Sequence, residues 1–138
     1  MDSEKLKTGI IELMEQSEFE ELVFRAVQGI PDEFQELLEN IEIVVQDWPS
    51  RSQIRKLRLR DKYDLLGLYE GTPRTERDQR YNLVPPDRIT IFQGPLESEC
   101  RSRAELQQEV ARVVKHEIAH YFGLDEARLE EIEKGDSA

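Results

Sequence analysis

The amino-acid sequence predicts one α+β domain with a small sheet. Amphipathic helical patterns lie near both ends of the chain, and three short apolar segments bounded by proline or glycine lie between them. The length of 138 residues matches one compact unit rather than two. We therefore expect residues 1–138 to form a single domain, in which residues 1–17 are an N-terminal extension that is either loosely ordered or helical.

Two helices are predicted in the first third of the chain. From Glu18 onward, apolar residues recur at spacings of three and four until the sequence Gly29-Ile30-Pro31 ends the pattern. Pro31 suits the first turn of a second, short helix, because proline lacks the N–H that this turn leaves unpaired. The acidic residues that follow Pro31 favour a helix N-terminus.

Three strands are predicted in the middle of the chain. The β-branched segment from Ile41 is bounded by Pro49, and residues 65–70 end at a Gly-Thr-Pro breaker. Residues 87–93 alternate in polarity and are closed by a Gly-Pro pair, which completes a small sheet. Between the strands we expect a connector or helix at residues 50–62 and a polar surface loop at residues 72–86.

A long helix is predicted from Ser102 to about Leu124. Ser102 and Glu105 have the spacing of a capping box at its start. Gly123 suits its end, because glycine adopts the left-handed turn that terminates many helices. A short final helix is expected at residues 127–133.

Composition and charge exclude several classes of protein. With 38% hydrophobic and 36% charged residues, the sequence is typical of a soluble globular protein. The start of the chain has no apolar signal segment, and Cys100 is the single cysteine, so we expect a cytoplasmic protein without disulfides. The net charge of −11 argues against nucleic acid and anionic membranes as partners.

The charge is distributed unevenly along the chain. Residues 51–80 carry nine basic and five acidic side chains, net +4, and the basic residues are densest in the stretch 51–62. This stretch is either a patch that contacts RNA or an acidic partner, or a solvated connector that compensates the acidic ends. No aromatic residue is interleaved within it, which disfavours stacking on single-stranded nucleic acid.

The long helix carries the motif HEIAH, which points to a metal site. His116 and His120 are four residues apart and therefore lie on one helix face, where both imidazoles can bind one ion. Glu117 lies about 100° around the helix from His116 and can act on water beside the metal. These are the only two histidines of the chain, and a chance HExxH would arise with a probability of only about 0.2%.

The position of the motif on the helix also bears on its role. A lone histidine on a helix is most often a hydrogen-bonded residue near the core. Here both histidines lie at the border of the apolar arc of the helix, on the side of Glu109 and Arg112. This border position favours metal binding over a core role.

A third protein ligand is needed, because two imidazoles alone bind zinc weakly. When His116 is counted as position one, Gly123 is position eight and Glu126 is position eleven, where such motifs place a ligand. Glu126 is the first candidate, and the adjacent Asp125 is the alternative. Both residues can also simply begin the final helix.

The motif and its surroundings resemble a known family. The segments HEIAHYFGLDEARLEEI, PPDRITIFQGPLE, LLGLYEGTPRTER and IPDEFQELLENIEIVVQDWP resemble the small bacterial zincin-like metallopeptidases, or minimal metzincin-like proteins, over residues 18–133. The resemblance implies a zincin-like α+β fold, with a mixed sheet of three to four strands packed on the motif helix. It also implies a zinc ion bound by His116, His120 and Glu126, with Glu117 as the catalytic glutamate. The family usually has aspartate where this chain has Glu126.

The function expected on these grounds is zinc-dependent hydrolysis of peptide bonds by a metal-activated water, with Glu117 as the general base. The substrate would be a peptide or unfolded protein that adds to a sheet edge, supplied by residues 65–70 or 87–93. Candidate donors to the oxyanion are Tyr69, Tyr121 and Arg128. The alternative function is a non-catalytic metal-binding or protein-interaction module that retains the zincin scaffold.

Overall fold

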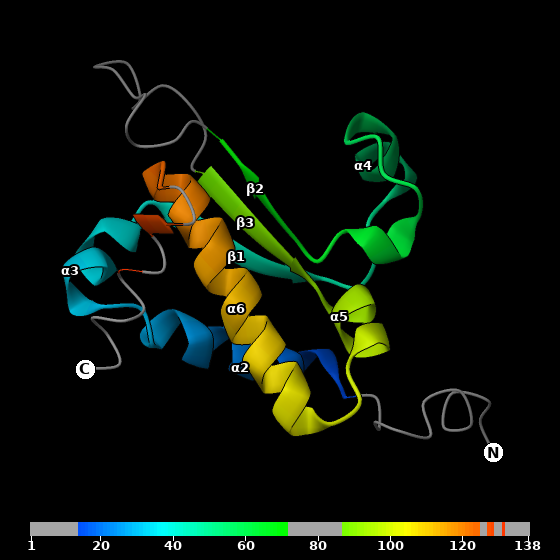
Figure 1. The fold of residues 1–138 in the computed structure, drawn as a ribbon, viewed down its shortest axis with the longest axis horizontal. Coiled ribbons are helices and arrows are strands. Elements are labelled where there is room, and N and C mark those ends of the chain that lie inside the picture. The colour runs from blue at the N-terminus through cyan, green and yellow to red at the C-terminus, as the bar shows by residue number, and fades with distance from the viewer. Residues whose placement is uncertain (1–13, 72–86, 125–126, 129–130, 132–138) are drawn as a thin grey trace.

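The computed structural model describes residues 14–71, 87–124, 127–128 and 131. Within these residues the chain has an α+β architecture, in which a small mixed sheet packs on the long helix α6 (Arg103–Phe122) (Figure 1). The predicted fold class is therefore confirmed. The expected extension at residues 1–17 lies mostly outside the described residues, although Met14 is buried in the core.

The first helix, α2 (Gln16–Gln28), begins two residues before the predicted start. The backbone N–H of Glu15 donates to the Glu18 carboxylate at 3.2 Å, which satisfies a polar group at the helix start. After Pro31 the chain forms one turn of helix, α3 (Asp32–Gln35), followed by a 3₁₀ turn, η1 (Glu36–Leu38). Both predicted N-terminal helices are thus present.

The sheet has three strands in the order β1-β3-β2. Strand β1 (Ile41–Gln46) pairs in parallel with β3 (Asp87–Phe92), and β2 (Gly67–Glu70) pairs antiparallel to β3. The three predicted strands are confirmed, with β2 beginning two residues later than expected. Strand β3 is paired on both sides, so of the two predicted edge segments only β2 lies at an edge.

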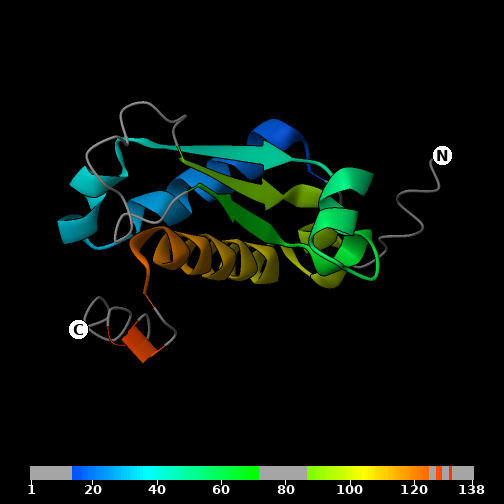
Figure 2. The ribbon, with the colours of Figure 1, turned by 90° about the horizontal axis from the view of Figure 1, so that it is seen from above.

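One face of the sheet is covered by helices. Helix α6 contacts β2 and β3, and α2 contacts β1 and α6, so the two helices lie side by side beneath the sheet (Figure 2). The core between them is apolar, and its fully buried members include Phe19 of α2, Ile89 and Ile91 of β3, and Leu106 of α6. This packing fixes the rotation of α6 and therefore decides which of its residues face β2.

The connector after β1 is partly helical. Helix α4 (Arg51–Lys56) starts at Ser50, whose Oγ accepts the N–H of Gln53 at 3.1 Å. A second 3₁₀ turn, η2 (Lys62–Asp64), leads to β2. The helical alternative for residues 50–62 is therefore the one that the structure supports.

A helix that was not predicted follows β3, where the sequence indicated only a Gly-Pro pair that closes the strand. The Gly94-Pro95 pair does not end the chain's regular structure but lies in the first turn of α5 (Gln93–Glu99), directly after β3. Proline is tolerated there because the N–H groups of the first turn have no partner within the helix. Glycine is required because a side chain at position 94 would collide with the ring of Trp48.

Helix α6 begins and ends as the sequence predicted. Ser102 Oγ accepts the N–H of Glu105 at 3.0 Å, although the Glu105 carboxylate accepts the N–H of Arg101 rather than completing a capping box with Ser102. Gly123 closes the helix in the left-handed region, at φ 70°. None of the helices within the described residues is long and apolar enough to cross a membrane.

Two further predictions fall wholly or partly outside the described residues. The expected surface loop at residues 72–86 is one of them. Of the expected final helix, the structure describes Ala127, Arg128 and Glu131, which are helical, and Arg128 Nη1 lies 2.7 Å from Glu131 Oε2.

Candidate metal centre

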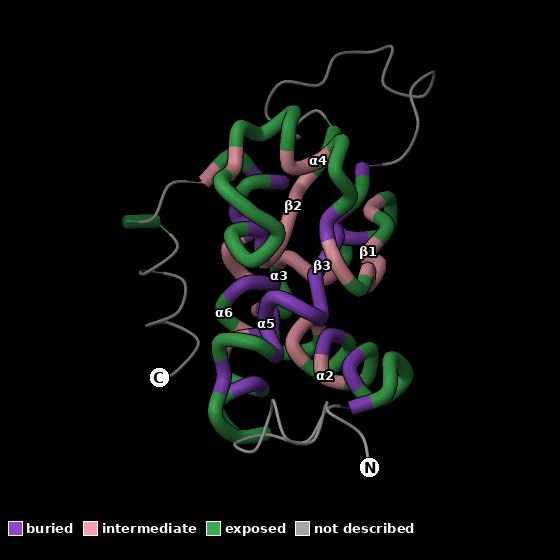
Figure 3. Tube along the Cα trace, turned by 90° about the vertical axis from the view of Figure 1, so that its right-hand side faces the viewer, coloured by how far each residue is buried: buried purple, intermediate pink, exposed green. Residues whose placement is uncertain are grey.

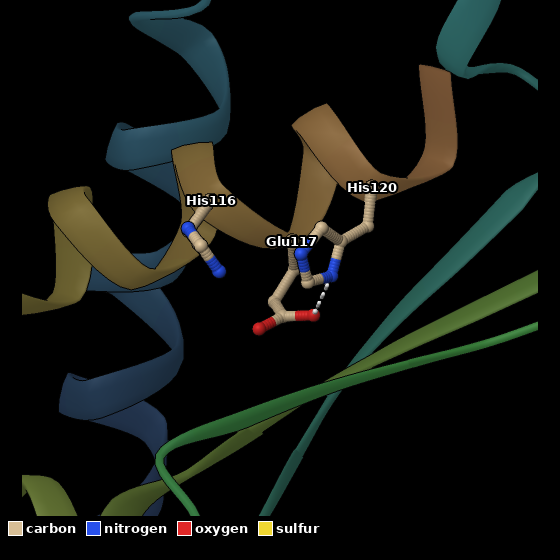
Figure 4. A group of neighbouring side chains, drawn as sticks. All are labelled: His116, Glu117 and His120. Atoms are coloured by element: carbon tan, nitrogen blue, oxygen red, sulfur yellow. Dashed lines mark ion pairs between the residues drawn. The ribbon is translucent and has the colours of Figure 1, made fainter. Parts of the chain in front are cut away.

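The three motif side chains project from one side of α6 toward strand β2. His116 and His120 lie one turn apart, Glu117 follows His116 directly, and Figure 4 shows the three side chains gathered on the sheet side of the helix. This arrangement follows from the helical repeat, because residues at spacings of one, three and four fall within a single arc of the helix surface. The predicted border position is confirmed, since Glu117 is buried, His116 is half-buried and His120 is exposed.

The donor atoms are close enough to hold one ion. One ligand atom from each of the three side chains lies within 4.8 Å of the others, and the two imidazole centroids are 4.5 Å apart. Two nitrogen ligands of a tetrahedral zinc ion are separated by about 3.4 Å, so only small rotations of the rings are needed. Imidazole nitrogens are ligands that zinc prefers, and the Glu117 carboxylate lies close enough to act on water beside the ion. The residues present therefore fit a zinc ion.

Glu117 lies in an environment that makes its carboxylate more basic. Burial raises the pKa of Glu117, while nearby His116 and a hydrogen bond from the backbone N–H of Tyr69 partly oppose this shift. In addition, His120 Nδ1 lies 3.4 Å from Glu117 Oε1. The carboxylate is thus partly desolvated, close to β2 and in contact with His120.

The register of the sheet explains why Tyr69 can reach Glu117. The Phe92 N–H donates to the Leu66 carbonyl at 3.0 Å, so residues 66, 68 and 70 form the hydrogen-bonded pairs with β3. The backbone groups of Gly67 and Tyr69 consequently point away from β3, toward the edge of β2 that carries no further strand within the described residues. The Tyr69 N–H lies on the side of Glu117 there and favours the charged form of its carboxylate.

Gly67 permits the close approach of β2 to the motif helix. A Cβ at this position would lie 2.7 Å from Val113 Cγ1 and 3.1 Å from Glu117 Cγ. Sequence reasoning did not assign Gly67 to the site, nor the Tyr69 N–H to Glu117. The sequence did contain a signal for Gly67, since a glycine inside a strand often marks the close approach of another element.

The third ligand predicted from the sequence is not placed by the structure. Asp125 and Glu126 both lie outside the described residues. The turn that precedes them is described, and its Gly123 N–H donates to the His120 carbonyl at 3.0 Å. The choice between the two carboxylates therefore stays a prediction.

The candidate oxyanion donors have other roles in this structure. The Tyr121 side chain is fully buried, and its hydroxyl donates to the Leu37 carbonyl at 3.2 Å. The Tyr69 hydroxyl donates to Asp87 Oδ2 at 2.7 Å, and Arg128 is paired with Glu131.

A mixed sheet whose edge strand lies along a helix bearing HExxH defines the class of zincin-type metal-site proteins. The family model for zincin-like metallopeptidases matches residues 38–136, which is most of the chain. The protein therefore belongs to the zincin-like metallopeptidase family. No curated protein sequence matches the chain.

Proposed function

We propose that this protein is a zinc-dependent peptidase in which His116 and His120 hold the metal and Glu117 is the general base. The observation that carries the proposal is the placement of a buried carboxylate between two histidines at the open edge of a strand. Membership of the zincin-like family supports it. Glu126, or alternatively Asp125, would supply the third ligand.

The chemistry is divided between the metal and Glu117. Zinc, when bound, polarises the scissile carbonyl and lowers the pKa of water. Glu117 accepts a proton from the attacking water and then donates it to the leaving amine. Partial desolvation raises the pKa of this carboxylate, which makes it a better proton acceptor than an exposed glutamate.

The substrate proposed for this site is a peptide or unfolded segment in extended conformation. Its backbone would pair with β2, where the Gly67 N–H and carbonyl point outward within the described part of the sheet. Strand β3 is unsuitable, because both of its edges are already paired. A peptide at this edge passes directly beside Glu117.

The decisive experiment compares wild type with Glu117→Ala on a quenched random-peptide library, after both proteins have been loaded with zinc. Loss of the general base is expected to reduce kcat/KM by about 10²- to 10⁴-fold while zinc content stays the same. Elemental analysis of both preparations measures the zinc. Equal turnover by the two proteins would refute the assignment of Glu117.

The same measurement separates the peptidase from the non-catalytic module. Stoichiometric zinc in both proteins with no hydrolysis by either would favour a metal-binding interaction module on the zincin scaffold. His116→Ala serves as the metal-site control, since it is expected to lose zinc as well as activity.

A further inference from the structure

The basic stretch of the sequence forms an exposed lobe at one end of the sheet. We define the basic lobe as residues 51–64, which comprise α4, the turn after it and η2. It carries six cationic and two acidic side chains, net +4, in a chain of net charge −11. Figure 3 shows the α4 region largely exposed. The six exposed cations are Arg51, Arg55, Lys56, Arg58, Arg60 and Lys62.

The six cations of the basic lobe have no ion-pair partners among the described residues. The two acidic side chains of the lobe bind backbone instead: Asp61 Oδ1 accepts the Tyr63 N–H at 2.9 Å, and Asp64 Oδ2 accepts the Arg60 N–H at 3.1 Å. The lobe therefore creates a local positive potential on an otherwise acidic protein, and this potential attracts anionic polypeptide segments.

The lobe is also anchored to the domain. Lys62 Nζ lies 4.5 Å from the centroid of the Trp48 ring, and the Tyr63 ring meets the same ring edge-on at 5.2 Å. Trp48 in turn packs on Gly94 of α5. Because three neighbours engage the Trp48 ring, stacking of a nucleobase on it is disfavoured, and this argues for a polypeptide rather than single-stranded nucleic acid as the partner.

The basic lobe leads directly into the proposed substrate edge. Its last residue, Asp64, is three residues before Gly67, a distance of at most about 11 Å. Gly67 packs against Glu117, and Figure 1 shows α4 beyond the start of β2. A polypeptide paired with β2 and continuing past Gly67 therefore runs toward the last residues of the lobe.

We propose that the basic lobe is a docking surface for an acidic segment of the polypeptide substrate, on one side of the bond that is cleaved. This inference rests on the proposed peptidase function, because it takes the orientation of the substrate from β2. With about 3.3 Å per extended residue, the acidic residues lie roughly three to six positions from the scissile bond. The acidic remainder of the chain repels such a segment and so confines it to the lobe.

The first test measures binding without cleavage, using the zinc-loaded Glu117→Ala variant. The probes are a labelled peptide of about 12 residues with four consecutive glutamates, its glutamine counterpart, and oligouridylate of equal length. We expect the glutamate peptide to bind at least about tenfold more tightly than the glutamine peptide at low salt, and the difference to shrink near 300 mM salt.

Charge reversal locates the binding site. In the same background, Arg55→Glu with Lys56→Glu is expected to abolish the preference for glutamate. The matched control, Arg25→Glu with Arg101→Glu, changes the net charge equally at exposed positions outside the lobe and is expected to preserve it. Arg55→Gln with Lys56→Gln is a milder second pair of substitutions and is expected to weaken the same preference. Equal affinity for both peptides, equal effects of lobe and control variants, or tighter binding of oligouridylate would overturn the proposal.

The second test measures kcat/KM of zinc-loaded wild type on peptides with glutamates placed on either side of a common cleavable centre. Faster cleavage with glutamates on one side, lost in the lobe variant but not in the control, supports docking. Cleavage of all peptides at the same rate, wherever the glutamates lie, would refute the docking surface but not the proposed peptidase function. Selective binding of the glutamate peptide without any cleavage would refute the proposed peptidase function but not the binding of acidic segments by the lobe.

Discussion

At the residue scale, the carboxylate of Glu97 connects Met14, the first described residue, to α5. Glu97 is buried, and its Oε2 accepts the Met14 N–H at 3.1 Å and a hydrogen bond from Gln93 Nε2 at 3.2 Å. Gln93 Nε2 also donates to the Met14 carbonyl at 2.9 Å. Burial is the main cause that raises the pKa of Glu97 above its ordinary value, and the bonds from Met14 and Gln93 oppose the shift.

This raised pKa has a definite effect on stability. Between the ordinary value of 4.5 and the raised value, the folded protein binds more protons at Glu97 than the unfolded chain does. The contribution of Glu97 to the free energy of unfolding therefore falls as pH rises through this window and is constant above it. Glu97→Gln keeps an acceptor but cannot ionise, so its stability relative to wild type should grow over the same window.

Urea unfolding of wild type and Glu97→Gln at several pH values measures this difference. A difference that does not change with pH would contradict the prediction. Glu97→Ala also removes the acceptor for the Met14 N–H and is expected to lose about 1 to 3 kcal/mol relative to Glu97→Gln.

Residue-scale predictions from sequence succeeded where the geometry is local. The spacing of His116 and His120 determines their separation through the helical repeat, so the closeness of the two imidazoles could be predicted directly. The burial of Glu117 and its interaction with the Tyr69 backbone depend on the register of the strands and the rotation of the helix. Local sequence patterns predict neither of these. The third ligand stays a prediction for a similar reason, because its place depends on the path of the chain after Gly123.

At the element scale, the contact between β2 and α6 bears on the position of Glu117, the proposed general base. Gly67→Ala places a methyl group 2.7 Å from Val113 Cγ1 and 3.1 Å from Glu117 Cγ. The strand or the glutamate must then move, so we expect a loss of about 1 to 3 kcal/mol in stability. We also expect kcat/KM to fall up to about 10²-fold, because the base is misplaced.

Leu68→Ala is the matched control, since this residue lies on the opposite face of the same strand and does not face Glu117. It should lower stability without a comparable loss of activity per folded molecule. Thermal unfolding and peptide hydrolysis measure the two effects separately. Full activity and stability in Gly67→Ala would show that β2 does not position Glu117.

The elements themselves were largely predictable from sequence. Helix α6 was located by its apolar periodicity, Ser102 and Gly123, and the strands by β-branched segments between breakers. Helix α5 was missed because Gly94 and Pro95 usually end regular structure, whereas here the glycine makes room for Trp48 and the proline occupies a first turn. The deciding contact with Trp48 is tertiary and leaves no local signature.

At the scale of the whole molecule, zinc binding should stabilise the folded state. A ligand that binds only the folded protein adds about 2.7 kcal/mol when its concentration is 100 times Kd, so Tm should rise with added zinc. His120→Ala is the informative variant, because the His120 side chain is 48% exposed and its truncation costs little packing by itself. We expect this variant to unfold near the Tm of the metal-free wild type and to show no rise with zinc.

Differential scanning calorimetry with and without zinc, and again after chelation, measures these shifts. An equal rise in Tm for wild type and His120→Ala would mean that the stabilising ion binds elsewhere. No rise in wild type that contains stoichiometric zinc would mean that the ion has equal affinity for the folded and unfolded chains.

The attachment of Glu117 to the Tyr69 amide makes the proton acceptor depend on the sheet edge that we propose receives the substrate. A substrate segment that pairs with β2 and shifts it by a fraction of an ångström is expected to change the direction of the Tyr69 N–H. The orientation of the Glu117 carboxylate is then expected to change with it. Substrate binding at β2 and proton transfer by Glu117 are then expected to depend on each other. A segment that docks out of register would leave the base misaligned, so selection among substrates extends beyond affinity to the chemical step.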